Sequence, residues 1–383
     1  MDRKTLTTLE TRKKSHDFGM LLQTAAQQSG RSVWQIAFDV LRYRMRRHRI
    51  YSNDYFKFGL FRTDISPAEK EAFVSEGEMT RINRALAAPA EMSLAGLLES
   101  KILTGLVLRA AGLPTSETVA VAIGRPVPLP FASLTGADAV ERFLREEAPY
   151  PIFGKPDLSR QGIGGASLMK LDQDEIVLGN GTRVGIRALA TEIARDYPDG
   201  YLFQGLLRPH PALAALIGPV IGTLRVVTLM QAEGPEALFL MLKLPGPGAM
   251  VDGGVSKVNG AAIVDAGTGR ILRAQLLSRP ITEPMTHGHV TGAPLVGAEV
   301  SDVNAAVALA LQAHRLFPRQ GVLGFDIMLT DAGPLINEIN LNPGSSLAQS
   351  ARGAGLMDAP TKERYRAAFA VHGVRLPLPG VRL

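Results

Sequence analysis

The sequence predicts an α+β protein, in which helices and strands gather in separate layers. Three observations lead to this prediction: a helical pattern over residues 16–90, a cluster of strands from residue 151 onward, and two final strands joined by a short turn. Runs of strands with few helices between them differ from the regular alternation of a doubly wound parallel sheet.

The N-terminal segment is predicted to be mostly helical. Trp34, Phe38 and Leu41 recur at i, i+4 and i+7, which places them on one helix face, with Val40 and Met45 beside them. The first 50 residues hold 11 basic and four acidic side chains, a net charge of +7, whereas the other 333 residues carry 31 basic and 32 acidic ones. The basic character of the chain is therefore local, and we do not expect a nucleic-acid partner.

Further helices follow. Ser66 is a candidate N-cap with Pro67 at the first helical position of SPAEKEAFVSEGEMTRINRAL. A helix over 94–111 is expected to end at Gly112, with Pro114 beyond it. A short strand near 118–123 and a helix over 136–147 complete this part.

Residues 151–207 predict a small α+β unit. The segments PIFGKP and SLMKLD flank the glycine-rich turn SRQGIGGAS, so the three together predict a hairpin with a mobile tip. A helix at 185–196 and a strand at 200–207 follow. The next section is rich in strands, namely TLRVVTLM, EALFLMLKL, GAAIVD and ILRAQLL, and a helix at 301–316 precedes the last two, VLGFDIMLT and PLINEINLN.

Composition excludes several classes of site. The chain has no cysteine, which rules out disulfides, thiolate metal sites and a cysteine nucleophile. No run of 18 apolar residues predicts a membrane span, and the charged N-terminus lacks the apolar core of a signal peptide. We therefore expect a cytoplasmic protein.

The strongest candidate site lies on the last two strands. Glu338, Asn340 and Asn342 share one face of an alternating strand, and the turn at 331–333 folds Asp326 beside them. Carboxylate and carboxamide oxygens suit Mg²⁺, which takes its other ligands from substrate phosphates and water. An Asp/Glu pair on the solvated face of a hairpin is the simpler alternative.

Two cationic features lie upstream. Lys155 stands in an apolar strand six residues before a loop in which Gln161, Gly162, Gly164 and Gly165 can bring backbone N–H groups to a polyphosphate. Neither a P-loop nor a dinucleotide-binding spacing is present, and a plain glycine turn is the alternative. Arg225, like Lys243, lies within an apolar strand, so it either pairs with a core carboxylate or reaches into a cleft.

These motifs together resemble the ATP-grasp superfamily. The segments that carry the resemblance are FGKP, QGIGGAS, YLFQGLL, TLRVVT, GFDI and NEINLNPG, over roughly residues 35–350. NEIN-x-NPG is similar to the metal-binding strand of D-alanine–D-alanine ligases. The closer likeness is to sugar-transfer-associated ATP-grasp proteins, which share the helical N-terminal region and the HP…TLR segment, here His210, Pro211, Thr223, Leu224 and Arg225.

The resemblance implies an ATP-grasp fold in which two α+β subdomains clasp ATP beneath the glycine hairpin. It divides the chain into a basic helical region (1–90), an N-terminal part of the ATP-grasp unit (91–148), a lid subdomain (149–208) and a catalytic subdomain (209–383). It assigns Lys155, with Lys101, to the phosphates and Arg225 to the transferred phosphate or the tetrahedral intermediate. Asp326, Glu338 and Asn340 would hold one or two Mg²⁺, and the hinge that binds adenine would be Gln204, Gly205, Leu206 and Leu207.

The reaction it implies joins a carboxylate to an amine through an acyl phosphate. Two departures from the ligase pattern stand out: Gly324 replaces an arginine two residues before the metal aspartate, and Gln204 replaces an acidic hinge residue. The oxyanion donor would then be Arg225 or the backbone N–H groups after Pro343. Substrate-side candidates are His287, Asn342, Gly344 and Ser345.

His287 and His289 lack a third ligand at zinc spacing, so they are either ordinary loop histidines or supply a base toward the amine. Two other functions stay open. One is an ATP-grasp kinase acting on a hydroxyl, and the other is a non-catalytic nucleotide-binding accessory of glycan assembly. Expected partners are small-molecule carboxylates and amines, with peripheral membrane contact through the N-terminus and a homodimer as further alternatives.

Overall fold

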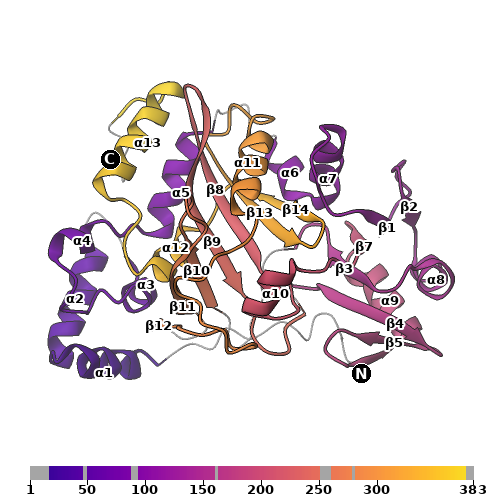
Figure 1. The fold of residues 1–383 in the computed structure, drawn as a ribbon, viewed down its shortest axis with the longest axis horizontal. Coiled ribbons are helices and arrows are strands. Elements are labelled where there is room, and N and C mark those ends of the chain that lie inside the picture. Colours follow the sequence, from indigo (N-terminus) through magenta and orange to yellow (C-terminus); the bar gives the residue numbers. More distant parts are fainter. Residues whose placement is uncertain are drawn as a thin grey trace.

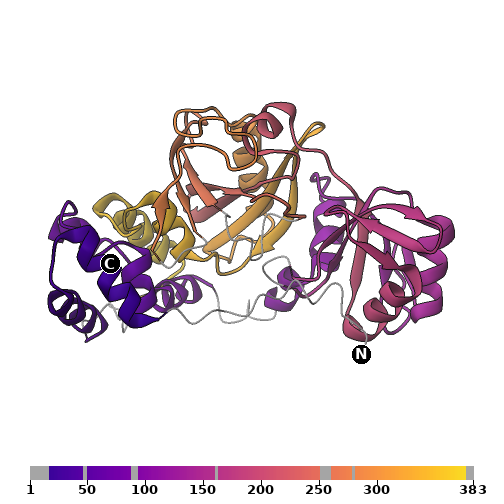
Figure 2. The same cartoon turned by 90° about the horizontal axis from the view of Figure 1, so that it is seen from below.

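The computed structural model describes residues 17–45, 50–87, 94–159, 163–250, 260–277 and 281–376. Two seven-stranded sheets and the helices that cover them form an α+β molecule, as the sequence predicts. Helices α1 to α4 lie at one end, the first sheet lies at the other, and the second sheet lies between them (Figures 1 and 2). No described helix is long and apolar enough to cross a membrane.

The helices before the first strand are α1 (Phe18–Ser29), α2 (Val33–Met45), α3 (Ser52–Lys57), α4 (Pro67–Glu71), α5 (Glu76–Ala85), α6 (Leu94–Glu99) and α7 (Lys101–Ala110). Ser66 caps α4, as expected, and it also forms a capping box with Glu69. The helix predicted to run on from Ser66 is, however, two helices. Ser75 is the N-cap of the second helix, α5, and its hydroxyl accepts a hydrogen bond from Glu78 N.

The helix predicted over 94–111 is also split. Ser100 interrupts it, because its hydroxyl accepts a hydrogen bond from Leu103 N and donates one to Asp157 Oδ2. Asp157 Oδ1 in turn accepts from Ile102 N at 2.8 Å. A carboxylate from a distant segment therefore caps α7, and the local sequence pattern gives no sign of this contact.

The predicted apolar face of α2 points outward. Trp34, Phe38 and Leu41 are exposed, whereas Ile36 and Val40 pack against the neighbouring helices. The helix is where the pattern predicts it, and a second apolar face fills the core.

The first sheet has the strand order β2-β1-β7-β3-β4-β5-β6, and all its neighbours are antiparallel except β1 and β2. Its elements are β1 (Thr118–Ala122), β2 (Ala132–Leu134), α8 (Ala137–Arg142), a π-helical turn (Phe143–Glu147), β3 (Ile152–Pro156), β4 (Ala166–Asp172), β5 (Glu175–Leu178), β6 (Arg183–Gly185), α9 (Ile186–Asp196) and β7 (Tyr201–Gly205). The hairpin predicted around the glycine turn is β3–β4. Strands from 91–148 and from 149–208 share this one sheet.

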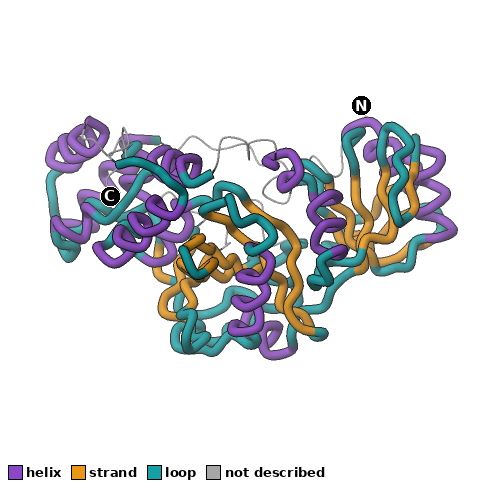
Figure 3. Tube along the Cα trace, turned by 90° about the horizontal axis from the view of Figure 1, so that it is seen from above, coloured by secondary structure: helices purple, strands orange, loops and turns teal. Residues whose placement is uncertain are grey.

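The second sheet is antiparallel, in the order β12-β11-β10-β9-β8-β13-β14. Its elements are α10 (Pro211–Ile217), β8 (Thr223–Gln231), β9 (Gly234–Leu244), β10 (Gly260–Val264), β11 (Ile271–Leu276), β12 (Glu283–Pro284), α11 (Val303–His314), β13 (Val322–Thr330), β14 (Gly333–Asn340), α12 (Ser345–Arg352) and α13 (Ala359–Val371). Figure 3 shows the strands in two separate groups with helices around them.

The two faces of the second sheet carry different residues. Leu224, Phe325 and Ile339 belong to the core that packs beneath α11. On the opposite face, α5, α12 and α13 cover other parts of the same strands. Because side chains alternate along a strand, Arg225 and Asp326 are directed to the face away from α11.

Candidate functional site

A row of three charged residues crosses neighbouring strands of the second sheet. Asp326 on β13 pairs in register with Arg225 on β8 and with Glu338 on β14. Residues directly opposite in an antiparallel pair have Cβ atoms about 5 Å apart and point to the same face. The sequence therefore placed Asp326 and Glu338 correctly beside each other.

Asp326 is the centre of a buried charge cluster. Its Oδ1 accepts from Arg225 Nε at 2.6 Å, and its Oδ2 accepts from Arg225 Nη2 at 2.8 Å and from Lys243 Nζ at 2.9 Å. Burial disfavours the carboxylate, but the charges of Arg225 and Lys243 outweigh that effect and hold the pKa of Asp326 well below its usual range. The carboxylate is therefore ionised at any physiological pH.

A β-bulge brings one more polar side chain to this site. Asp326 pairs with Glu338 but Ile327 pairs with Ile336, so Asn337 is the extra residue. Its Oδ1 accepts a hydrogen bond of 2.6 Å from Lys155 Nζ on β3. This contact joins the two sheets, and Asn337 is a site residue that we did not predict.

Asn340 completes the set of oxygen ligands expected for a metal. It lies opposite Gly324 in the register, and its Nδ2 is buried without a hydrogen-bond partner. A buried amide N–H without a partner would be satisfied by an acceptor atom of a ligand, whereas a metal would take the Oδ1 of the same carboxamide. Among the described residues no three His, Asp or Glu side chains gather as a metal site. Metal binding by Asp326, Glu338 and the Asn340 carboxamide stays a prediction. This small oxygen set fits Mg²⁺, which needs only one or two protein carboxylates.

Gly324, two residues before Asp326, has no room for a side chain. A Cβ at Gly324 would lie 2.7 Å from Pro343 Cβ, which is shorter than van der Waals contact. The proline of the NPG segment therefore fills this space. The cationic groups beside Asp326 are those of Arg225 and Lys243.

Lys101 lies at the base of the glycine hairpin. Its Nζ donates to the backbone oxygens of Asp157 at 2.7 Å and Ser159 at 2.8 Å. Lys101 thus ties the start of α7 to the segment that leaves β3. In this arrangement it holds the hairpin base, and phosphate binding by Lys101 stays a prediction.

The glycines of the hairpin have different surroundings. Gly164 has φ +77°, and a Cβ there would lie 2.7 Å from Pro156 Cγ and from the Tyr197 hydroxyl. Its carbonyl accepts from Tyr201 Oη at 3.0 Å, and Gly165 beside it is buried. Gly164 is therefore required for close packing of the hairpin. Gln161 and Gly162, which we predicted to contact phosphates, lie outside the described residues.

The predicted hinge follows β7. Gln204 is buried and its Nε2 donates to Thr118 Oγ1 at 3.1 Å, while Leu206 N donates to Pro151 O at 3.3 Å. A Cβ at Gly205 would meet nothing within 4 Å. The backbone N–H of Leu206 is already engaged, and adenine binding by Gln204, Gly205, Leu206 and Leu207 stays a prediction.

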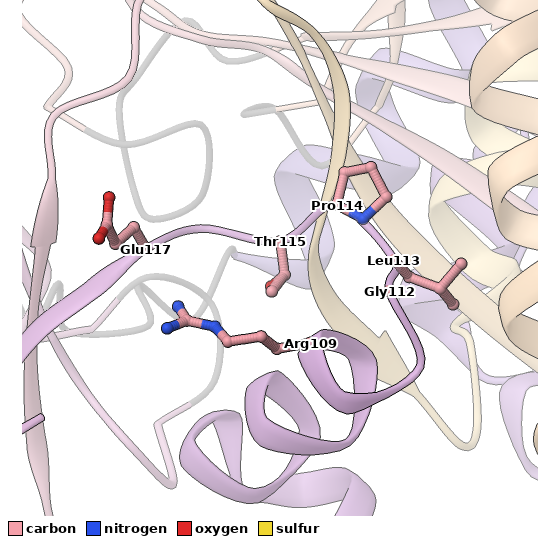
Figure 4. A pocket seen from close by; sticks show the side chains of 6 residues that line it. All are labelled: Arg109, Gly112, Leu113, Pro114, Thr115 and Glu117. Atoms are coloured by element: carbon pink, nitrogen blue, oxygen red, sulfur yellow. The ribbon is translucent and has the colours of Figure 1, made fainter. Parts of the chain in front are cut away.

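An open pocket of about 400 Å³ adjoins this hinge (Figure 4). It is lined by Arg109, Gly112, Leu113, Pro114, Thr115 and Glu117. Glu117 O accepts from Gly205 N at 3.4 Å, and Thr115 Oγ1 donates to Ile336 O at 2.9 Å. The linker between α7 and β1 therefore contacts both sheets, and nothing in its sequence singles it out.

The segment after Pro343 is held by the N-terminal helices. Glu76 Oε2 accepts from Ser345 N at 3.2 Å, Ser345 Oγ at 3.1 Å and Ser346 N at 3.1 Å. Asn342 accepts from Asn83 Nδ2 at 2.7 Å and donates to Thr80 Oγ1 at 2.9 Å.

The residues proposed for substrate therefore have structural partners. The Ser345 backbone N–H and the Asn342 carboxamide are engaged by α5, and a Cβ at Gly344 would come within 3.5 Å of Glu76 Oε1. His287 is exposed, and its Nδ1 lies 3.0 Å from Thr286 Oγ1. It pairs through the backbone with Pro294, in a loop that packs on α10 through Gly288. A substrate role for these residues remains a prediction.

Comparison with known proteins gives one family match. A family described as sugar-transfer associated ATP-grasp matches residues 92–363. No curated protein matches the chain in sequence.

Among solved structures, the VanG D-Ala:D-Ser ligase of Enterococcus faecalis is similar at 10% identity and a TM-score of 0.42, covering 72% of this chain and 62% of that one. The D-alanine–D-alanine ligase of Bacillus anthracis is similar at 11% identity and a TM-score of 0.40, covering 73% and 69%. A biotin carboxylase of Campylobacter jejuni is similar at 12% identity and a TM-score of 0.42, covering 74% and 48%. The chain thus spans about 62% of the length of the VanG ligase.

Proposed function

The chain belongs to the sugar-transfer associated ATP-grasp family, and on that premise we propose that it is an ATP- and Mg²⁺-dependent ligase joining a carboxylate to an amine. The observation that carries the proposal is the row Arg225–Asp326–Glu338 on the sheet face away from α11. Lys243 and Lys155 reach the same region, through Asp326 and Asn337 respectively.

The charge of this group favours a polyanion. Two carboxylates stand against the cations of Arg225, Lys243 and Lys155, so the five side chains carry a net charge of +1. With one divalent cation added, the total of +3 would complement the triphosphate of ATP, which carries up to four negative charges.

The protein ligands of the metal would be Asp326, Glu338 and the Asn340 oxygen. Arg225 and Lys243 supply three hydrogen bonds to a carboxylate that offers about four lone-pair positions, which is compatible with one metal bond in addition. When bound, Mg²⁺ neutralises phosphate charge and aligns the phosphate to be transferred.

The proposed reaction has two steps. A carboxylate oxygen of the substrate attacks the γ-phosphorus of ATP, the bond to the bridging oxygen breaks, and ADP leaves. The amine nitrogen then attacks the carbonyl carbon of the acyl phosphate, the bond from that carbon to the phosphate oxygen breaks, and the nitrogen loses a proton. Neither step needs a nucleophile from the protein, so the chain has to supply positioning and charge neutralisation.

Three groups of residues would provide this. Lys155 and Arg225 would neutralise charge on the transferred phosphate. The hinge at Gly205 would orient the nucleotide, and the hairpin around Gly164 would exclude water, because an acyl phosphate hydrolyses when exposed.

A screen for ADP release tests the proposal. The protein is incubated with ATP, Mg²⁺ and pools of carboxylates and amines, and the products are identified by mass spectrometry. We expect ADP and phosphate in equal amounts, dependent on both a carboxylate and an amine. A phosphorylated product formed without any amine would establish the kinase reaction instead.

A matched pair of variants tests the metal site. Glu338→Gln keeps the size of the side chain and removes its charge, and we expect it to retain the fold and lose Mg²⁺-dependent ADP release. Glu233→Gln, on the exposed turn between β8 and β9, is the control and should keep full activity. Unchanged turnover in Glu338→Gln would show that the metal assignment is wrong.

A further inference from the structure

Helix α2 has two apolar faces, and only one of them is used by the fold. Ile36, Val40 and Tyr43 are buried in the core of the N-terminal helices. The outer stripe consists of Trp34, Phe38, Leu41 and Met45, whose exposed fractions are 85%, 68%, 50% and 75%. Four large apolar side chains in a row are costly to leave in water unless something covers them.

The spacing of the outer stripe is that of one continuous helix face. Its members follow each other at intervals of four, three and four residues, so they form a line along most of a 13-residue helix. Scattered exposed apolar residues are ordinary on a protein surface, but a line of this kind marks a binding face.

Arginines border the stripe on both sides. At about 100° per residue, Arg42 falls on one side of the stripe and Arg44 on the other. The single acidic residue of α2, Asp39, is buried and shared by Arg31 at 2.8 Å and Arg42 at 3.2 Å. The surface around the stripe is therefore positive, as is the first 50-residue segment as a whole.

We propose that this stripe binds the surface of an anionic lipid bilayer. A helix with aromatic and aliphatic side chains on one face and arginines along its borders lies flat at the boundary between headgroups and acyl chains. Tryptophan is especially favourable there, because its ring is apolar and its N–H can remain hydrated. The arginines would contact the phosphate of acidic headgroups.

Two other coverings fit the observations less well. Residues 1–16 contain only Leu6 and Leu9 as large apolar residues after Met1, together with five basic ones, so they have little to pack on the stripe. A second copy of the chain would bring two positively charged surfaces together. Helix α2 also lies at the end of the molecule away from the first sheet, so a membrane that binds this end leaves that sheet accessible (Figures 1 and 2).

The stripe contains its own reporter. Trp34 is the only tryptophan of the chain, so its fluorescence reports on this face alone. The full chain is titrated with vesicles of phosphatidylcholine, and in parallel with vesicles of phosphatidylcholine mixed with phosphatidylglycerol. We expect the emission of Trp34 to shift to the blue and the protein to sediment with the mixed vesicles only, and added salt to weaken binding.

Variants on the stripe separate its apolar and charged parts. Phe38→Gln combined with Leu41→Gln keeps the reporter and should weaken binding by more than about tenfold. Arg44→Gln should weaken it about fivefold. Leu272→Gln, on β11, removes an equally exposed leucine elsewhere and should bind as the parent does. Thermal unfolding should be unchanged in all of them, since none of these side chains is buried.

Four results would overturn the proposal. The first is emission that stays at the water-exposed wavelength with both kinds of vesicle, and the second is equal binding to both. The third is a blue emission without vesicles that is independent of protein concentration, which would mean that the chain covers its own stripe. The fourth is a blue emission that grows with protein concentration, which would mean that a second copy covers it.

Discussion

Asp326 and Arg225 form a bidentate ion pair, with Nε 2.6 Å from Oδ1 and Nη2 2.8 Å from Oδ2. The sequence left two alternatives for Arg225, pairing with a core carboxylate or reaching into a cleft. The structure shows the first alternative, since Arg225 pairs with a buried carboxylate. That carboxylate, of Asp326, is also the candidate metal ligand. Ion pairing and the proposed chemistry thus depend on the same two side chains.

Removing the charge of Asp326 should destabilise the fold. Asp326→Asn leaves Arg225 and Lys243 without their shared carboxylate, and their side chains are only 12% and 19% exposed. Loss of one partner of a buried pair costs about 3–5 kcal/mol, because the remaining charge stays desolvated. Urea unfolding monitored by circular dichroism measures this change.

The matched control is an exposed pair in the first sheet. Arg183 Nε lies 2.7 Å from Glu175 Oε2, with both side chains nearly half exposed. Glu175→Gln should cost about 0–1 kcal/mol. If the two variants lost the same stability, burial would not explain the strength of the Asp326 cluster.

Gly324 should not tolerate a side chain. Gly324→Ala places a Cβ 2.7 Å from Pro343 Cβ, and such overpacking costs about 1–3 kcal/mol. Adding Pro343→Gly, which removes that Cβ, should recover part of this loss. Gly205→Ala, whose Cβ would meet nothing within 4 Å, should be neutral or slightly stabilising. A Gly324→Ala protein as stable as its parent would contradict the steric explanation.

Glu76 should stabilise the start of α12. It accepts hydrogen bonds from two backbone N–H groups there, so Glu76→Ala should cost about 1–2 kcal/mol and speed hydrogen exchange at Ser345 and Ser346. Glu69→Ala removes a comparable bond to Ser66 N on exposed α4 and should cost less. Equal costs, or unchanged exchange at Ser345, would argue against this role of Glu76.

His314 should make stability depend on pH. Burial lowers its pKa to about 4, while an unfolded histidine titrates near 6.5. Below pH 6.5 the unfolded chain binds a proton that the folded chain does not, so the stabilisation is complete above pH 6.5 and is lost as pH falls toward 4. The slope is at most about 1.4 kcal/mol per pH unit.

A glutamine variant isolates this effect. His314→Gln keeps an amide donor toward Gln320 O, which the ring Nε2 contacts at 2.7 Å. Urea midpoints measured at pH 7 and pH 5 should fall further apart in the parent than in the variant. His372 is present in both proteins, and burial lowers its pKa as well, so only the difference between them reports on His314. Identical pH dependence would assign the effect to other groups.

The sequence predicted the pairing of β13 and β14 well because two local rules were sufficient. Strict alternation placed Phe325 and Ile327 in the core and Asp326 on the other face, and the short turn at 331–333 fixed the antiparallel partner. Neither rule accounts for Asn337. Ile336 and Ile339 are both buried although they are three residues apart, which regular alternation does not allow, and this spacing is the signal that could have revealed the bulge.

Other errors came from contacts between distant segments. The break at Ser100 depends on Asp157, and the start of α12 depends on Glu76, so no local window contains both partners. In α2 the periodicity predicted the helix but not which of its two apolar faces is buried. Which face is buried depends on the helices that pack against α2, and the pattern within one segment contains no information about them.

The bulge on β14 also bears on how such a site can originate. Without Asn337, Ile327–Ile336 and Asp326–Glu338 would be consecutive pairs of an ordinary ladder, with every side chain on its present face. One inserted codon thus adds the partner of Lys155 and leaves the carboxylates opposite each other. A lineage could gain or lose the bridge between the two sheets by a single-residue insertion or deletion, without rebuilding either strand.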